Sequence, residues 1–284
     1  MADIHFGTDG WRAIIGEDFT PDNLNRVVAA AARIFKEEAV AAGRDPQAPG
    51  TLIVGHDCRQ DAHAYAELAA QVAAGEGFNV LLTEDYCPTP TLCWSVAHND
   101  DAVGGIMLTS SHNPAEYLGV KLRMADGGAS PAEFTDRVEA VLPPEPTDIL
   151  GPFQTADLMT DYLAALRELV DVEAIRGANL RVVCDPLYGA GRHYLAGLLR
   201  DMGVEVVEIH NTEDPTFAGL HPEPIQPWVD EGLAKRGRAG LRCPVHQRWR
   251  RRPHCRWRLA RQLRERSPHH HAAHEAHGRP RRDG

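Results

Sequence analysis

The polar segment Thr-Ser-Ser-His-Asn-Pro, residues 109–114, holds side chains whose types and spacing suit covalent chemistry. An apolar run over residues 102–108 precedes it, a pattern typical of a buried strand that ends in a tight loop. A serine hydroxyl held in such a loop can act as a nucleophile or carry a phosphoryl group, so Ser111 is the candidate for this role. Histidine titrates near neutral pH, so His112 can move a proton beside it. An ordinary surface turn uses the same residue types and is the alternative interpretation.

Two cations elsewhere in the sequence extend this candidate site. Phosphoryl transfer needs an acceptor oxygen, positive charge to offset the phosphate, and a group that moves protons. Arg12 and Lys121 supply the positive charge, and with Ser111 and His112 they form a set that suits this reaction. Each cation also has a structural alternative. Lys121 could be a solvated lysine at the end of a strand, and Arg12 could form an ion pair with Asp9 or another acid.

Five motifs, taken together, resemble one known family. In chain order they are residues 6–12 (Phe-Gly-Thr-Asp-Gly-Trp-Arg), 109–114, 116–121 (Glu-Tyr-Leu-Gly-Val-Lys), 185–191 (Asp-Pro-Leu-Tyr-Gly-Ala-Gly) and 221–224 (His-Pro-Glu-Pro). The second resembles the phosphoserine loop of the α-D-phosphohexomutases, the phosphoglucomutase/phosphomannomutase family. The others resemble further motifs of that family, in the family's order, over roughly residues 4–232. The third departs from the family pattern at Leu118, where asparagine is usual.

The resemblance implies a reaction and a role for each candidate residue. In this family the serine carries a phosphoryl group, donates it to a hexose phosphate, and recovers the other phosphoryl group from the bisphosphate intermediate. Ser111 would be this phosphoserine. Arg12, His112 and Lys121 would contact phosphates or assist proton transfer, with Lys121 as the preferred general base. The implied activity is an isomerase of the phosphohexomutase type, such as one converting glucose 1-phosphate to glucose 6-phosphate, with hexose phosphates and hexose bisphosphate as partners.

The resemblance also implies Mg²⁺ as the cofactor. The family binds it with an Asp-Gly-Asp-x-Asp-Arg loop together with a phosphoserine oxygen, so Ser111 would be a metal ligand through its phosphate. Hard oxygen ligands suit this cation, whose charge offsets that of the transferring group. The sequence does not contain the aspartate loop.

Three other features have alternative roles. Arg59 could bind phosphate, but the family comparison favours a residue that braces the sheet. The glycines at 189 and 191 could cradle a phosphate at a helix N-terminus, although a tight strand-to-helix turn that needs glycine is the favoured interpretation. We assign no role to Asp185.

Helical and strand patterns alternate along the chain. Helices are predicted over residues 20–43, 62–74, 88–94, 156–170 and 189–202, and strands over residues 51–54, 80–82, 102–108, 120–122, 180–184 and 204–209. This alternation favours an α/β fold of three-layer α/β/α domains with a mixed, mostly parallel sheet. We expect a complete phosphohexomutase-like domain I at residues 1–148, with Pro143–Pro146 as a linker, and an incomplete domain II at residues 149–232.

Composition narrows the location of the protein. No early segment combines a basic start with an apolar run, and no apolar run approaches the roughly 18 residues that a membrane span needs. The six cysteines lack the spacing of a zinc site, so we expect thiols in a reducing environment. The prediction is a cytoplasmic protein without a membrane partner.

The net charge of −10 hides a sharp division of the chain. Residues 1–232 carry a net charge of −23, whereas residues 233–284 carry +13 and are rich in Arg, His and Pro. Such a composition does not bury a core, so this tail is expected to be non-native or disordered. It could be a nucleic-acid-binding arm, a metal-binding histidine tract, or the product of a shifted reading frame.

The genetic code supports the shifted frame. Residues 247–255 can be encoded so that reading one nucleotide later gives Asn-Asp-Gly-Asp-Ala-Asp-Arg-Ile, which resembles the family's metal loop. We place the shift between Glu231 and Leu241. The chain is therefore interpreted as a truncated, inactive phosphohexomutase with no nucleic-acid partner. The alternative is a non-catalytic sugar-phosphate-binding or interaction protein with a basic nucleic-acid-binding tail.

Overall fold

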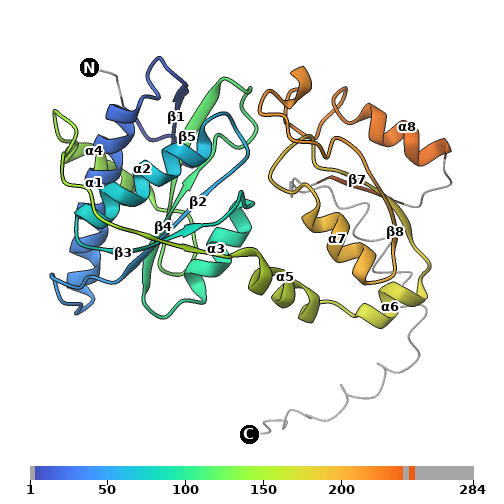
Figure 1. Ribbon diagram of the computed structural model, residues 1–284, viewed down its shortest axis with the longest axis horizontal. Helices are drawn as coiled ribbons and strands as arrows, with labels where there is room; N and C mark the ends of the chain where they lie inside the picture. Colours follow the sequence, from blue (N-terminus) through green and yellow to red (C-terminus); the bar gives the residue numbers. More distant parts are fainter. Residues whose placement is uncertain (1–3, 239–242, 247–284) are drawn as a thin grey trace, which may run out of the picture.

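A computed structural model describes residues 4–238 and 243–246 of the chain, which form two α/β units (Figure 1). The first unit is built on a six-stranded sheet with the order β1-β5-β4-β2-β3-β6. Its strands are β1 (Trp11–Ile14), β2 (Thr51–His56), β3 (Asn79–Thr83), β4 (Ala102–Leu108), β5 (Tyr117–Met124) and β6 (Gln154–Ala156). Neighbouring strands pair in parallel except around β5, which is antiparallel to both β1 and β4. The sheet is thus mixed and mostly parallel, as predicted.

Helices cover both faces of this sheet, which gives the predicted three layers. Along β4, Ile106 and Leu108 face the core under α1 (Pro21–Ala41), α2 (Ala62–Gly75) and α4 (Ala132–Ala140). Met107 between them faces the opposite core, under α3 (Thr89–Ala97) and α5 (Met159–Glu168). This alternation follows from the two-residue period of a strand, because both faces of the sheet are buried.

Local sequence explains the first helix. The hydroxyl of Thr20 accepts a hydrogen bond from the backbone N–H of Asn23 at 3.2 Å, and Pro21 occupies the first turn. Both features are strong signals for a helix start, and the helix follows the prediction closely. Its Phe35 packs over β4 at Gly104, where a Cβ atom would lie 2.3 Å from the Phe35 ring. The glycine therefore lets the helix approach the sheet.

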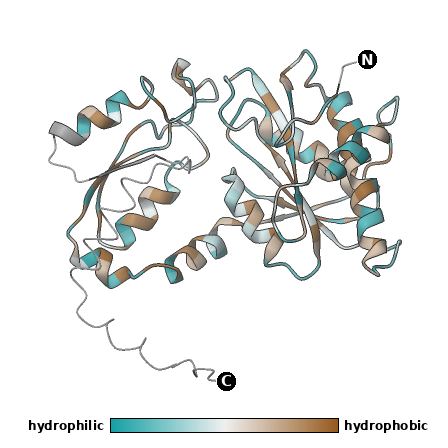
Figure 2. Ribbon diagram, turned by 180° about the vertical axis from the view of Figure 1, so that it is seen from behind, coloured by the Kyte–Doolittle hydropathy of each residue, from teal (hydrophilic) through white to brown (hydrophobic). Residues whose placement is uncertain are grey.

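The second unit has a smaller, parallel sheet in the order β8-β7-β9. Its elements are α6 (Val172–Gly177), β7 (Arg181–Asp185), α7 (Tyr194–Asp201), β8 (Glu205–Glu208), the 3₁₀ turn η1 (Phe217–Gly219), α8 (Asp230–Arg238) and β9 (Cys243–His246). Hydrophobic and hydrophilic residues alternate along the helices and strands of both units (Figure 2).

Several predicted boundaries are wrong. Ala156 ends strand β6 instead of opening a helix, and α5 starts only at Met159. Strand β6 pairs with β3, so the first sheet includes residues beyond 148. Helix α7 begins at Tyr194 and not at Gly189, because His193 has a left-handed φ that interrupts helical geometry just before it.

The expected linker is attached to the first unit. The guanidinium of Arg26 donates a hydrogen bond to the Pro143 carbonyl at 2.7 Å, and Asn25 exchanges two hydrogen bonds with the backbone of Thr147. These contacts hold the segment against α1. Strand β1 and helices α4 and α6 were not predicted, because their apolar patterns are short.

Part of the basic segment expected to be disordered is ordered. Helix α8 reaches Arg238, and residues 243–246 form β9 beside β7. The rest of that segment, residues 239–242 and 247–284, lies outside the described residues. Within the described part, Cys58, Cys87, Cys93 and Cys184 are free thiols, as predicted. None of the helices described is both long and apolar enough to cross a membrane.

Candidate active site

The site begins where two neighbouring parallel strands end. Strands β2 and β4 pair in register, with His56 opposite Leu108, so the loops that follow them leave the same edge of the sheet. One loop carries Asp57 and Arg59, and the other is the serine loop, which we define as residues 109–114. Ligands of open α/β sheets bind at such carboxyl ends. The topology thus places the serine loop where the sequence predicted.

A chain of hydrogen bonds fixes Ser111 in its loop. Its backbone N–H donates to the hydroxyl of Thr109 at 3.0 Å, and that hydroxyl donates to the Asp57 carboxylate at 2.5 Å. Ser111 has a left-handed φ of 60°, which costs about 1–3 kcal/mol for a residue with a side chain. Its Oγ lies 3.4 Å from Nδ1 of His112, within reach of a proton transfer. By contrast, the neighbouring Ser110 is fully buried.

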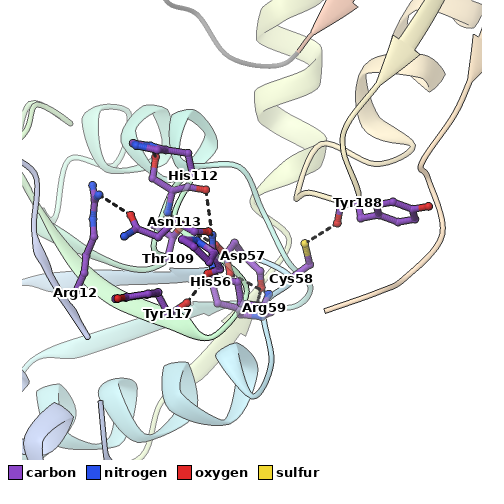
Figure 3. Close-up of polar contacts among 12 residues, drawn as sticks. Arg12, His56, Asp57, Cys58, Arg59, Thr109, His112, Asn113, Tyr117 and Tyr188 are labelled. Atoms are coloured by element: carbon purple, nitrogen blue, oxygen red, sulfur yellow. Dashed lines mark hydrogen bonds and ion pairs between the residues drawn. The ribbon is translucent and has the colours of Figure 1, made fainter. Parts of the chain in front are cut away.

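Arg59 clamps the serine loop from below (Figure 3). This side chain is buried, with only 4% of its surface exposed, and pairs with Asp57 at 3.3 Å. Its two terminal nitrogens donate to four backbone carbonyls, those of Ser111, Asn113, Pro114 and Tyr117, at 2.6–3.3 Å. Both terminal nitrogens are therefore committed to the loop, and the observed contact of Arg59 favours the bracing role over phosphate binding.

Arg59→Lys is expected to loosen the serine loop. A lysine keeps the charge beside Asp57 but cannot match the planar fork that reaches four carbonyls. Because hydrogen bonds to charged groups contribute about 1.5–3 kcal/mol each, we expect a loss of about 2–4 kcal/mol of folding stability. Urea unfolding measures this loss, and amide exchange should accelerate at Ser111 and Asn113. The control is Arg33→Lys, at a half-exposed ion pair with Glu76, and should change stability little. Unchanged loop exchange in a folded Arg59→Lys protein would contradict the clamp.

Arg12 reaches the same loop from the edge of the sheet. Its guanidinium donates to the side-chain oxygen of Asn113 at 2.9 Å, so Asn113 and not Asp9 is its partner (Figure 3). Its Nε is buried and has no hydrogen-bond partner among the described residues. The backbone of β1 approaches β5 closely here, because Gly10 adopts a positive φ at a point where a Cβ would lie 2.3 Å from the Val120 carbonyl.

Lys121 belongs to a buried charge cluster beside the loop. Its Nζ lies 2.6 Å from the carboxylate of Asp9, whose other oxygen accepts from Arg123 at 3.0 Å. Burial lowers the pKa of Lys121 from its ordinary 10.5, while Asp9 opposes this effect. Burial alone would raise the pKa of Asp9, but the hydrogen bond and charge of Lys121 and the charge of Arg123 outweigh it, so the pKa lies below 3.8. The lysine is thus buried and paired, which excludes the solvated alternative.

Asp9→Asn is expected to lower the pKa of Lys121 further, because the carboxylate that stabilises the ammonium is removed. It should also cost about 1–2 kcal/mol of stability near neutral pH, allowing for screening at Asp9, whose side chain is 37% exposed. A depressed carboxylate pKa gives stability that is fully present above the unfolded value and is lost as the pH falls through the folded value. The difference between variant and wild type should therefore shrink below about pH 4.

Urea unfolding at neutral and acid pH measures this effect, and ¹⁵N NMR of the lysine ammonium follows its pKa. Asp136→Asn, an exposed acid on α4, is the matched control. A gap in stability that stays constant from pH 7 to pH 3 would contradict the assignment.

A cavity of about 210 Å³ lies between the two units, in front of the serine loop. Thr109, Ser111 and His112 line it from the first unit. The second unit contributes residues from two of the sequence motifs and from η1, namely Asp185, Pro186, Leu187, Gly189, Ala190, Phe217, Pro222 and Pro224. Three of the five motifs, which lie in separate segments of the chain, therefore meet around one space.

The four predicted site residues are only partly assembled around it. Ser111 and His112 line the cavity, whereas Arg12 is joined to the loop through Asn113 and Lys121 is held by Asp9. Two further lining residues were assigned no role from the sequence. The first is Cys58, but burial raises the pKa of its thiol to about 12, so it is not a nucleophile.

Asp185 is the second such residue. It is 2% exposed, and one carboxylate oxygen accepts from the N–H of Leu187 and faces Nδ1 of His210 at 2.9 Å. The signal that marks Asp185 is its position at the end of β7, equivalent to that of Asp57 after β2. The glycine turn at 189–191 lies before an irregular loop and not at the start of α7, which favours its backbone role.

Comparison with known proteins identifies the family. The model of the phosphoglucomutase/phosphomannomutase alpha/beta/alpha domain I matches residues 3–146, and that of domain II matches residues 160–239. The chain belongs to the phosphoglucomutase/phosphomannomutase family. The fold prediction and the recognition of its N-terminal portion are confirmed by these matches.

Individual relatives differ in the sugar named for them. A phosphoglucomutase/phosphomannomutase of Thermococcus kodakarensis is 32% identical over 224 residues, covering 77% of this chain and 47% of that protein. A phosphoglucosamine mutase of Synechococcus elongatus is 29% identical over 215 residues, covering 74% of this chain and 43% of its own length. A phosphopentomutase of T. kodakarensis is 30% identical, covering 77% and 45%. The chain therefore spans about half the length of these curated relatives.

A solved structure agrees with this assignment. A phosphomannomutase structure from Thermus thermophilus superposes with a TM-score of 0.76 at 37% identity, over 83% of this chain and 52% of that one. The described residues of this chain do not fit the Mg²⁺ site that the resemblance implies, because no three of their His, Cys, Asp or Glu side chains converge as metal ligands.

Proposed function

We propose that this chain is the N-terminal half of a sugar-phosphate mutase whose phosphoryl carrier is Ser111. The observation that carries the proposal is the serine loop itself: Ser111 lines the inter-unit cavity, in a left-handed turn that Thr109, Asp57 and Arg59 hold in place. Such fixed positioning suits a group that accepts and donates a phosphoryl group without moving. The substrates that we propose are sugar phosphates, with hexose phosphates and hexose bisphosphate as the favoured ones.

The proposed reaction has two transfers. A hydroxyl of the sugar phosphate attacks the phosphorus of phosphorylated Ser111, so that the sugar O–P bond forms as the Oγ–P bond breaks. The hydroxyl proton passes by way of Lys121 to the released serine oxygen. The second transfer runs in reverse at the other phosphate of the bisphosphate and restores phosphorylated Ser111. No net phosphate is gained or lost, so the overall reaction is an isomerisation.

Three side chains assist this scheme. A lysine is useful as a base when burial lowers its pKa, as at Lys121. Release from Asp9 would free its Nζ for the substrate hydroxyl. His112 provides a second proton carrier at 3.4 Å from Oγ. Arg12, whose guanidinium donates to Asn113, places positive charge next to the loop, where it offsets the charge of a phosphoryl group.

Transfer of label tests the proposal. The chain is incubated with ³²P-labelled glucose 1,6-bisphosphate, and the modified peptide is located by mass spectrometry. We expect one phosphoryl group on the segment Thr109–Lys121. Binding of the bisphosphate without any label would instead favour the non-catalytic sugar-phosphate-binding protein.

A further inference from the structure

Arg59 contacts both units of the molecule. Its guanidinium carbon lies 5.1 Å from the ring centroid of Phe217, which belongs to η1 in the second unit. Phe217 is 3% exposed and Arg59 is 4% exposed, so the contact is shielded from water. A cation stacked on an aromatic face is attracted by the ring quadrupole, and this attraction strengthens when both groups are desolvated.

The geometry of the guanidinium allows both sets of contacts at once. Its N–H donors point outward in the plane of the group, and at Arg59 they bind three carbonyls of the serine loop and that of Tyr117. Its flat face carries no donor and is free to stack on a ring. The edge of one buried group thus holds the loop while its face contacts Phe217.

Two other contacts between the units do not reach the loop in this way. Cys58 donates to the carbonyl of Tyr188 at 3.2 Å, and Arg192 stacks on Tyr86 at 4.6 Å. Neither pair includes the arginine that holds the serine loop. Phe217, in contrast, contacts Arg59, which holds the serine loop, and also lines the cavity that Ser111 faces.

Phe217 is held firmly enough to act on Arg59. Its backbone N–H donates to the Asp214 carbonyl at 3.0 Å, and its carbonyl accepts from Leu220 at 2.9 Å. Both Phe217 and Ala218 have positive φ values, so the turn has a specific shape that presents the ring.

We propose that Phe217 is a positioning residue for phosphoryl transfer: stacked on Arg59, it fixes the serine loop in the geometry that presents Ser111 to the cavity. The docked second unit thereby stabilises the reactive loop of the first. This inference rests on the proposed function for its catalytic consequence, but the stacking and its effect on the loop are independent of that function.

The test compares two substitutions in the full chain. Phe217→Leu keeps an apolar side chain but removes the ring, whereas Phe217→Tyr keeps the ring. We expect Phe217→Leu to accelerate amide exchange at Ser111 and Asn113 about tenfold and to slow phosphoryl uptake from glucose 1,6-bisphosphate by a similar factor. Phe217→Tyr should restore both to within about threefold of wild type.

Phe134→Leu is the control for a general loss of stability. Phe134 is also 3% exposed, but it lies in α4 and packs on Phe35 of α1. The Phe134→Leu substitution should lower the unfolding midpoint without selectively changing amide exchange in the serine loop. A Phe217→Leu protein whose loop exchanges like that of wild type would overturn the proposal.

A second measurement uses the unsubstituted chain and needs no variant to fold. Protons of a guanidinium over a ring face shift upfield in NMR, so the Arg59 guanidinium signals should show this ring-current shift. Its absence would overturn the proposal. If wild type takes up no label while Phe217→Leu still loosens the loop, the mutase assignment fails and the coupling stands.

Discussion

Ser111→Ala is expected to reduce phosphoryl uptake from glucose 1,6-bisphosphate to less than about 1% of the wild-type level. The alanine has no oxygen to form the Oγ–P bond, and the neighbouring hydroxyls are poorly placed to replace it as acceptor. Ser110 is adjacent, but it is fully buried and its Oγ is enclosed within the loop. Thr109 directs its hydroxyl to Asp57. The measurement is ³²P incorporation per chain, followed by mass spectrometry of the loop peptide.

Ser110→Ala is the matched control, since it removes a hydroxyl from the adjacent position of the same loop. The Ser110 hydroxyl has no hydrogen-bond partner in the described part of the chain, so its removal should leave the fold and the uptake near the wild-type level. Label on Ser110, or normal uptake by Ser111→Ala, would refute Ser111 as the carrier. Circular dichroism of both variants shows that the comparison is made between folded proteins.

Local pattern predicted the parts of the fold that depend on neighbouring residues. The start of α1 follows from Thr20 and Pro21, and the strand before the serine loop follows from a continuous apolar run. The side-chain alternation in β4 follows as well, because a strand buried on both faces requires apolar residues at successive positions. These are short-range effects that a sequence displays directly.

The contacts of Arg59 were not predicted because its partners are distant in the chain. The carbonyls that it binds lie 52–58 residues away, and backbone carbonyls have no signature in the sequence. The same applies to Lys121, whose partner Asp9 is 112 residues away. Only the pairing of β1 with β5 brings these charges together.

Strand β6 was not predicted for a related reason. The prolines at 143–146 suggested a linker, but strand β6 follows them and pairs with β3. This pairing joins segments that are distant in the chain, so the residues next to β6 do not indicate it. A three-residue strand carries too few alternating positions to be recognised. Asp57, the serine loop and Asp185 all lie at the ends of strands, as the apolar runs before them indicated.

Turnover of hexose phosphates by this chain is expected to be slow. A phosphoserine carries nearly two negative charges near neutral pH, and its transfer to a sugar hydroxyl requires preorganised positive charge. In this sequence Trp249, Arg250, Arg251 and Arg252 lie within the segment, residues 248–253, where the shifted frame would supply Asp-Gly-Asp-Ala-Asp. Arginine side chains cannot bind a divalent cation. Loss of a cation that stabilises the transition state raises the activation barrier by several kcal/mol, which slows the reaction by about three orders of magnitude. We therefore expect this chain to accept a phosphoryl group on Ser111 yet to turn over hexose phosphates at least about 1000-fold more slowly than a chain with the frame restored.

A coupled mutase assay with Mg²⁺ and a bisphosphate primer, run on both chains, measures this difference. Because this chain also spans only about half the length of its relatives, a frame-restored chain that stops at residue 284 serves as the matched control. It restores the aspartates without adding the rest of the protein. A gain already present in this control would trace the defect to the aspartate loop, whereas a gain only in the full-length restored chain would trace it to the length that the relatives have beyond this chain. Equal turnover by this chain and the full-length restored chain would refute the expectation, because the arginine-rich segment would then support transfer as well as the carboxylates do.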